Sequence, residues 1–154
     1  MNDTLDRLAR ELRLDDAAHE RLRLVFGHDC VERVRHLLED PRAVVALDGL
    51  AAFLAGRLDR AGLDALAAQA ADLAGHHPGS KSIDGCGHAA VSATYAVAKA
   101  LAGRAREAAD YAAYATVYAQ GGAAAVAERE SFATEFAWQA EHLSALARAS
   151  LSTT

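Results

Sequence analysis

The sequence predicts an all-α fold, a single-domain bundle of six or seven alanine-rich helices over residues 1–154. Alanine favours helix most strongly and has almost no side-chain entropy to lose, and it accounts for 39 of the 154 residues. Only two residues are proline, and no segment alternates apolar and polar residues over the length that a strand needs. A chain of this length buries roughly two thirds of its unfolded surface, so we expect a core without disulfides or structural metal.

Each expected helix has a local cause. Apolar residues recur at helical spacing over 16–39 and predict one long helix there. Asp40 followed by Pro41 is typical of a helix cap and first turn. The segment 76–88, rich in glycine and polar residues, predicts the main loop, and Gly121–Gly122 predicts a break before the last helix. In chain order the expected helices are 4–14, 16–39, 41 to about 56, a fourth ending near 75, about 84–102, 104 to about 120 and 123 to about 148.

Charge and cysteine content exclude several classes of function. Sixteen basic residues against 21 acidic ones give a formal net charge of −5. Because no basic surplus is available for phosphates or anionic lipids, we expect neither a nucleic-acid nor a membrane partner. The first residues are charged where a signal peptide is apolar. Cys30 and Cys86 lie far apart without a CxxC pair, which favours a reducing, cytoplasmic compartment.

Polar side chains interrupt the apolar stripe of the predicted helix 16–39. At about 100° per residue, Asp29, Arg33 and His36 fall in the same sector as Phe26. Asp29 and Arg33 are four residues apart, and a buried carboxylate needs such a partner to offset its loss of hydration. We therefore predict an Asp29–Arg33 ion pair, which either fixes helix register or supplies the carboxylate and guanidinium of an active site.

A second polar line lies on the helix expected from about residue 84. His88, Ser92, Tyr95 and Lys99 fall at i, i+4, i+7 and i+11. They form either a solvated polar face or, since this helix is poor in charge, an imidazole and a phenol in the bundle interior. His88 lies in the first turn, where the helix dipole disfavours the imidazolium and leaves a usable base.

Five potential metal ligands surround the predicted loop: His76, His77, Asp84, Cys86 and His88. Their spacing matches no zinc module, and a Cys86–His88 nucleophile is disfavoured because residues i and i+2 of a helix point apart. The chain also lacks a glycine-rich dinucleotide fingerprint and a P-loop, so no cofactor and no metal are expected. Three tyrosines at helical spacing predict the edge of the core or a homodimer surface: Tyr111, Tyr114 and Tyr118.

Several segments carry motifs: HDCVERVRHLLEDPR over 28–42, GHAAVSATYAVAKAL and AADYAAYA within 87–115, and FAWQAEHL over 136–143. They resemble motifs of a family of all-helical bacterial immunity proteins. In chain order these motifs are an Asp-Cys-Ala-Glu-Arg-Val signature with an acidic-Pro-Arg turn, a Gly-His-Ala helix, an Ala-Ala-x-Tyr-Ala helix and a closing Trp-Gln segment. The resemblance spans about residues 20–145 and implies an all-α fold and a protein toxin as partner. It carries over Asp29, Cys30, Glu32, Arg33 and His88, whereas Tyr95 stands where the family often shows a second histidine.

Two main interpretations of function follow. An immunity protein binds its toxin through an acidic or aromatic surface, whereas an enzyme needs a pocket where polar groups converge. The sequence narrowly favours a small cofactor-independent acid–base enzyme of the lyase or cyclase type. It would dehydrate a small hydrophobic molecule, or close its ring by conjugate addition, in bacterial secondary metabolism. A small-molecule-binding, self-resistance protein is a third interpretation.

The enzyme interpretation assigns a role to each inward polar residue. His88 or Asp29 removes a proton, and Tyr95 or Arg33 stabilises the enolate or protonates a leaving hydroxyl. The residues expected to contact the substrate are His36, Phe26, Ser92 and Cys30. This interpretation requires that the two polar lines meet in one hollow, where a single ligand can touch both.

Overall fold

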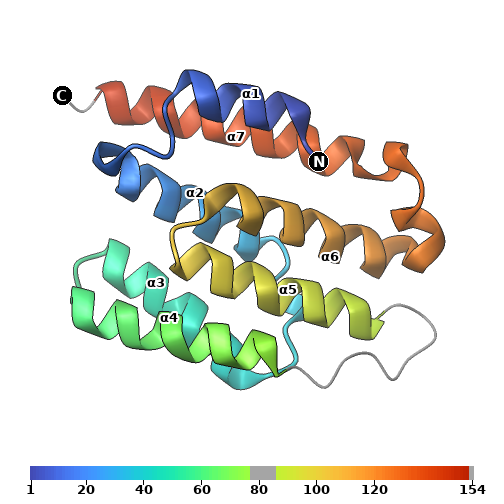
Figure 1. The fold of residues 1–154 in the computed structure, drawn as a ribbon, viewed down its shortest axis with the longest axis horizontal. Helices are drawn as coiled ribbons and strands as arrows, with labels where there is room; N and C mark the ends of the chain where they lie inside the picture. Colours follow the sequence, from blue (N-terminus) through green and yellow to red (C-terminus); the bar gives the residue numbers. More distant parts are fainter. Residues whose placement is uncertain (77–85, 153–154) are drawn as a thin grey trace.

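The computed structural model describes residues 1–76 and 86–152, which fold into an all-α structure, as the sequence predicts (Figure 1). No strand occurs in these two ranges. The α-helices are α1 Asp3–Glu11, α2 Glu20–Glu32, α3 Pro41–Leu54, α4 Arg60–Gly75, α5 Cys86–Leu101, α6 Ala105–Val126 and α7 Ala133–Ser152. Three short 3-10 helices join them: η1 Ala17–His19, η2 Arg35–Leu37 and η3 Arg129–Phe132.

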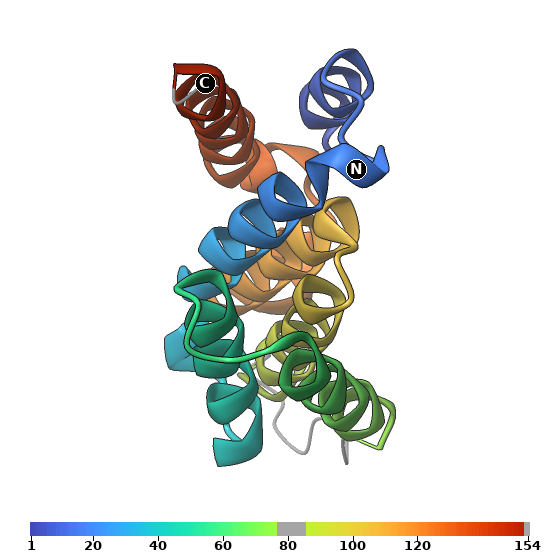
Figure 2. The same ribbon diagram turned by 90° about the vertical axis from the view of Figure 1, so that its left-hand side faces the viewer.

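The helices form two columns that are seen nearly end-on in Figure 2. One column contains α7, α2 and α3, and the other contains α1, α6, α5 and α4. Helix α2 lies at the centre and packs against α3, α5, α6 and α7. Its side chains Phe26, Cys30 and Val31 have no exposed surface and form the middle of the core.

Alanine lets α5 and α6 lie close together along their length. These two helices make the most extensive contact in the chain, and their buried faces consist largely of alanine. Small side chains allow helix axes to approach toward the lower end of the usual ~8–10 Å range. Buried alanines on this contact include Ala93, Ala96, Ala100, Ala108, Ala112 and Ala115.

The prediction of one long helix over 16–39 is wrong. Helix α2 ends at Glu32, and the backbone leaves helical geometry at Val34 (φ −117°, ψ 11°) before η2. Val34 is fully buried and Leu37 packs against the core, so the apolar spacing continues although the helix does not. This turn brings α3 back against α2.

Two local predictions are confirmed. The Asp40 side chain accepts a hydrogen bond from the Arg42 backbone N–H, with Pro41 in the first turn of α3. The chain also breaks its helical geometry at Gly122 (φ 65°, ψ −157°), a conformation that favours glycine. The expected start of the last helix at 123 is wrong, because η3 intervenes and α7 begins at Ala133. Among the described helices, none is both long and apolar enough to cross a membrane.

Candidate functional site

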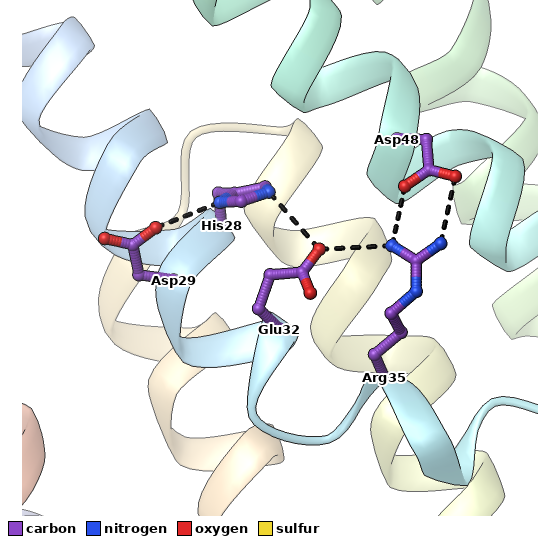
Figure 3. Close-up of polar contacts among 5 residues, drawn as sticks. All are labelled: His28, Asp29, Glu32, Arg35 and Asp48. Carbon is purple, nitrogen blue, oxygen red and sulfur yellow. Dashed lines mark hydrogen bonds and ion pairs between the residues drawn. The ribbon is translucent and has the colours of Figure 1, made fainter.

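The contact between α2 and α7 holds an unusual arrangement of one carboxylate and two imidazoles. The Nδ1 atom of His28 donates to Oδ1 of Asp29 at 3.0 Å, and the Nε2 atom of His142 on α7 donates to Oδ2 at 2.7 Å. Figure 3 shows the first of these bonds. An ionised carboxylate only accepts hydrogen bonds, so both ring nitrogens act as donors here.

The Asp29 carboxyl is stabilised as an anion by these two partners. Burial opposes its ionisation, but the hydrogen bonds from His28 and His142 and the attraction of their charge outweigh burial. Together they hold the pKa of Asp29 below its ordinary value. Asp29 therefore orients two imidazoles, a role that the sequence left open for this carboxylate.

The predicted Asp29–Arg33 ion pair is wrong, because Arg33 pairs with Glu135 of α7. The Nε and Nη2 atoms of Arg33 donate to the two carboxylate oxygens of Glu135 at 2.7 and 2.9 Å. The Glu135 side chain is only 6% exposed, whereas that of Arg33 is 37% exposed. This bidentate geometry is the strongest form of guanidinium–carboxylate contact.

Trp138 joins the two charged pairs. The guanidinium carbon of Arg33 lies 4.0 Å from the centre of the indole ring, and the His142 imidazole stacks on the indole with centroids 4.6 Å apart and planes at 14°. Phe26 contributes a further ring, 6.4 Å from His142. Cations are attracted to the face of an indole, so the indole supports both Arg33 and, when protonated, His142.

A chain of charges continues from α2 to α3, as Figure 3 shows. The Nε2 atom of His28 lies 3.5 Å from Oε1 of Glu32, and the Nη1 atom of Arg35 donates to the same oxygen at 3.2 Å. Arg35 also forms a bidentate pair with Asp48 of α3, at 2.6 and 3.0 Å. We call the whole set the α3–α2–α7 network: Asp48, Arg35, Glu32, His28, Asp29, His142, Trp138, Arg33 and Glu135.

One pocket reaches this network at Arg33. It has a volume of about 450 Å³ and lies between η2, the end of α6 and the start of α7. His36 lines it, together with Arg33 and Glu135, and the other lining residues include hydroxyl and amide groups. Neither Asp29 nor His142 lines this pocket.

Phe26 and Cys30 do not have the exposed position that substrate contact requires. Both side chains are fully buried in the core. Burial raises the pKa of the Cys30 thiol well above its ordinary value, and the negative charges of Glu135 and Asp29 raise it further. The expectation that Phe26 and Cys30 contact a substrate is therefore wrong for this conformation; they pack the helix that carries Asp29 and Arg33.

The second polar line lies away from the Arg33 pocket. His88 is exposed, and its ring stacks on Tyr118 of α6 at 5.2 Å rather than facing the bundle interior. Tyr95 is partly buried and stacks on Tyr111 of α6 at 5.1 Å. The pocket at Arg33 contains none of His88, Ser92 and Tyr95. The two polar lines predicted from the sequence therefore do not meet at the Arg33 pocket.

The tyrosines of α6 divide between core and surface. Tyr111 packs against the main core, whereas Tyr114 is one of the exposed large hydrophobic residues. The position of Tyr111 agrees with the expectation of a core edge.

Sequence reasoning missed the α7 half of the network. Glu135, Trp138 and His142 are spaced at i, i+3 and i+7 and thus share one helix face. This spacing indicates a shared polar face, but it does not identify the helix that the face contacts.

Of the five potential metal ligands around the loop, His77 and Asp84 lie in the segment 77–85, outside the described residues, and nothing is described of the Cys86 side chain. Over 1–76 and 86–152, no group of three or more histidine, cysteine, aspartate or glutamate side chains is arranged to hold a metal ion. Comparison of the chain with models of protein families, with curated proteins and with solved structures finds no match.

Proposed function

We propose that this chain binds a protein partner through the face formed by α3, α2 and α7, in the manner of an immunity protein that neutralises a toxin. The observation that carries the proposal is the α3–α2–α7 network, a continuous and partly exposed set of ion pairs and stacked rings. An immunity protein was expected to present an acidic or aromatic surface, and this face is both.

The composition of the face suits protein recognition. Tryptophan and arginine dominate the binding energy of protein interfaces, and here Arg33 and Trp138 are in contact within the network. The network contains four carboxylates and two guanidiniums. The carboxylates outnumber the guanidiniums, which favours a partner with a basic contact surface.

Internal pairing also prepares this face for binding. Arg33 is held by Glu135, and Arg35 is held by Asp48. Side chains that are ordered before binding lose less conformational entropy when a partner arrives. Three of the residues that carry the resemblance to immunity proteins belong to this network: Asp29, Glu32 and Arg33.

A growth-rescue assay tests the proposal. Each reading frame that flanks the gene is expressed alone and together with the chain, to identify one that stops growth and is neutralised. Trp138→Leu is then compared with His88→Ala, a variant outside the network. We expect growth with the wild type and with His88→Ala, and at least about 30-fold weaker binding of purified toxin to Trp138→Leu, as for a central interface residue. Thermal unfolding confirms that both variants fold. Failure of the wild type to rescue growth, or full rescue by Trp138→Leu, would refute the proposal.

A second function is favoured by the Asp29–His142 pair. A carboxylate that orients an imidazole is the usual support of a general base, and such a base contributes roughly 10²–10⁴-fold to a proton-transfer step. We propose as the alternative a cofactor-independent lyase or cyclase in which His142 or His36 moves the proton and Arg33 stabilises an enolate. In this mechanism His142 or His36 takes the role that the sequence assigned to His88, and Arg33 takes that of Tyr95, because His88 and Tyr95 lie outside the Arg33 pocket.

The alternative is tested with small β-hydroxyketones for dehydration and hydroxyenones for ring closure. Turnover that is lost in His142→Gln and in Asp29→Asn, while thermal unfolding is retained, would support it. Absence of turnover by the wild type on both substrate classes, or unchanged turnover in these variants, would exclude it.

A further inference from the structure

A second hollow, separate from the α3–α2–α7 network, lies between the start of α1, the C-terminal half of α6, η3 and α7. Its volume is about 580 Å³, within the range of small-molecule sites. No residue of the network lines it. We call it the aromatic groove and define it by the residues used below: Asp3, Tyr114, Arg129, Phe132, Phe136 and Glu141.

Three rings from different elements form one wall of the groove. Phe132 of η3 meets Tyr114 of α6 edge to face at 5.2 Å and stacks with Phe136 of α7 at 5.3 Å. Phe132 is buried, whereas the Tyr114 ring is 40% exposed. Exposing such a large ring leaves apolar surface in water, and a planar apolar molecule placed against these rings would remove it.

The charges around the rings favour a cation. Asp3 and Glu141 line the groove, both are exposed, and no ion pair is described for either within 1–76 and 86–152. Aromatic faces are themselves electron-rich and attract ammonium groups. The opposing charges are those of Arg129 and of the α-amino group of Met1, which also lines the groove. Arg129 lies between two exposed carboxylates, Glu128 and Glu130, that offset its field, and the amino group is attracted to Asp110, outside the groove.

We propose that the aromatic groove binds a planar aromatic molecule that carries a protonated amine. Its ring lies against Tyr114 and Phe136, and its ammonium group faces Glu141 and Asp3. The Arg129 guanidinium also lines the groove and supplies hydrogen-bond donors for a polar substituent of the ligand. This site is independent of the proposed partner-binding face.

The binding test uses 1-naphthylmethylammonium and 1-naphthoate, which share a ring system and differ in charge. Each is titrated into the full chain, and backbone amide shifts are followed by NMR. A molecule of this size is expected to bind in the millimolar range. Because ion pairing and ring contact both favour the cation, we expect it to bind about five- to tenfold more tightly than the anion. Shifts should centre on η3 and the start of α7.

Substitutions at exposed residues test whether the probes bind in the groove. Glu141→Gln should reduce the preference for the cation to about twofold or less. Glu39→Gln, the same change at an exposed carboxylate that does not line the groove, should leave the preference unaltered. Tyr114→Leu should weaken both ligands several-fold, and Tyr118→Leu, one helical turn away, should not. Equal or tighter binding of naphthoate, shifts confined to other helices, or no saturable binding of either probe would overturn the proposal.

Discussion

Replacing Arg33 by methionine tests how strongly the contact between α2 and α7 depends on one buried carboxylate. Glu135 is 6% exposed and receives two hydrogen bonds from Arg33. Methionine keeps an apolar stem beside Trp138 but removes every donor. Glu135 would then be left as an unpaired charge in the interior, the situation that makes broken ion pairs costly.

The structure sets the size of the effect. Removing one partner of a fully buried pair costs about 3–5 kcal/mol. The Arg33 side chain is 37% exposed, so water can reach Glu135 after the substitution and the loss should be smaller. We expect the free energy of unfolding to fall by about 2 kcal/mol, which for a chain of this size lowers Tm by roughly 4–8 °C.

Urea unfolding followed by circular dichroism at pH 7 measures this loss. The matched control is Arg42→Met, because Arg42 also makes a bidentate pair, with Asp40, but its side chain is 76% exposed. The control should change stability by less than about 0.5 kcal/mol. In addition, Arg33→Met combined with Glu135→Leu should recover much of the loss, since no charge is left unpaired. Equal stability of the two arginine variants, or no recovery in the double variant, would refute this reasoning.

Three further predictions concern pH and packing. The pKa of Asp29 is lowered in the folded chain. The ionised carboxylate therefore stabilises the fold fully at pH values above its pKa in the unfolded chain, and this stabilisation is lost as pH falls through its pKa in the folded chain. Below pH ~4 the unfolding free energy of the wild type should therefore depend on pH more steeply than that of Asp29→Asn. The difference in slope should be up to about one proton, or roughly 1.4 kcal/mol per pH unit. Burial raises the pKa of Asp110, so its ionised form disfavours folding at neutral pH, and Asp110→Asn should stabilise the chain by up to about 1 kcal/mol in thermal unfolding. Gly49→Ala should stabilise the chain less than Gly75→Ala does, by up to about 1 kcal/mol, because the new methyl group displaces the end of the Leu66 side chain and this offsets the gain in helix propensity.

Each of these has a result that contradicts it. An unchanged acid slope in Asp29→Asn would mean that the two imidazoles do not stabilise the anion. A lower Tm for Asp110→Asn at pH 7 would mean that the ionised carboxylate has a stabilising partner. For packing the control is Gly75→Ala, where nothing lies near the new methyl group; the overpacking argument fails if both glycine variants have the same stability.

The parts of the fold that sequence predicts well are those with local causes. A carboxylate before a proline starts α3 because the cap needs only neighbouring atoms. Gly122 breaks the last turns of α6 because its backbone takes a positive φ. The end of α2 at Glu32 has no such local sign, because the buried Val34 and the partly buried Leu37 continue the apolar spacing through a 3-10 turn.

The candidate site was less predictable because its partners lie far apart in the chain. Arg33 caps α2 with helical backbone angles (φ −65°, ψ −21°), so the i, i+4 spacing to Asp29 is kept, but this spacing does not decide which pair forms. Each side chain then meets α7 instead. Asp29 and His142 are 113 residues apart, and Arg33 and Glu135 are 102 apart. Helical periodicity identifies such polar faces but not the helix that each one contacts.

The stacking of Arg33 and His142 on Trp138 has a practical consequence, because Trp138 is the only tryptophan in the chain. All of the indole fluorescence therefore originates at the contact between α2 and α7. The intensity and wavelength of this emission therefore report whether α7 is packed against α2. The docking of α7 can be followed in real time without a dye or label.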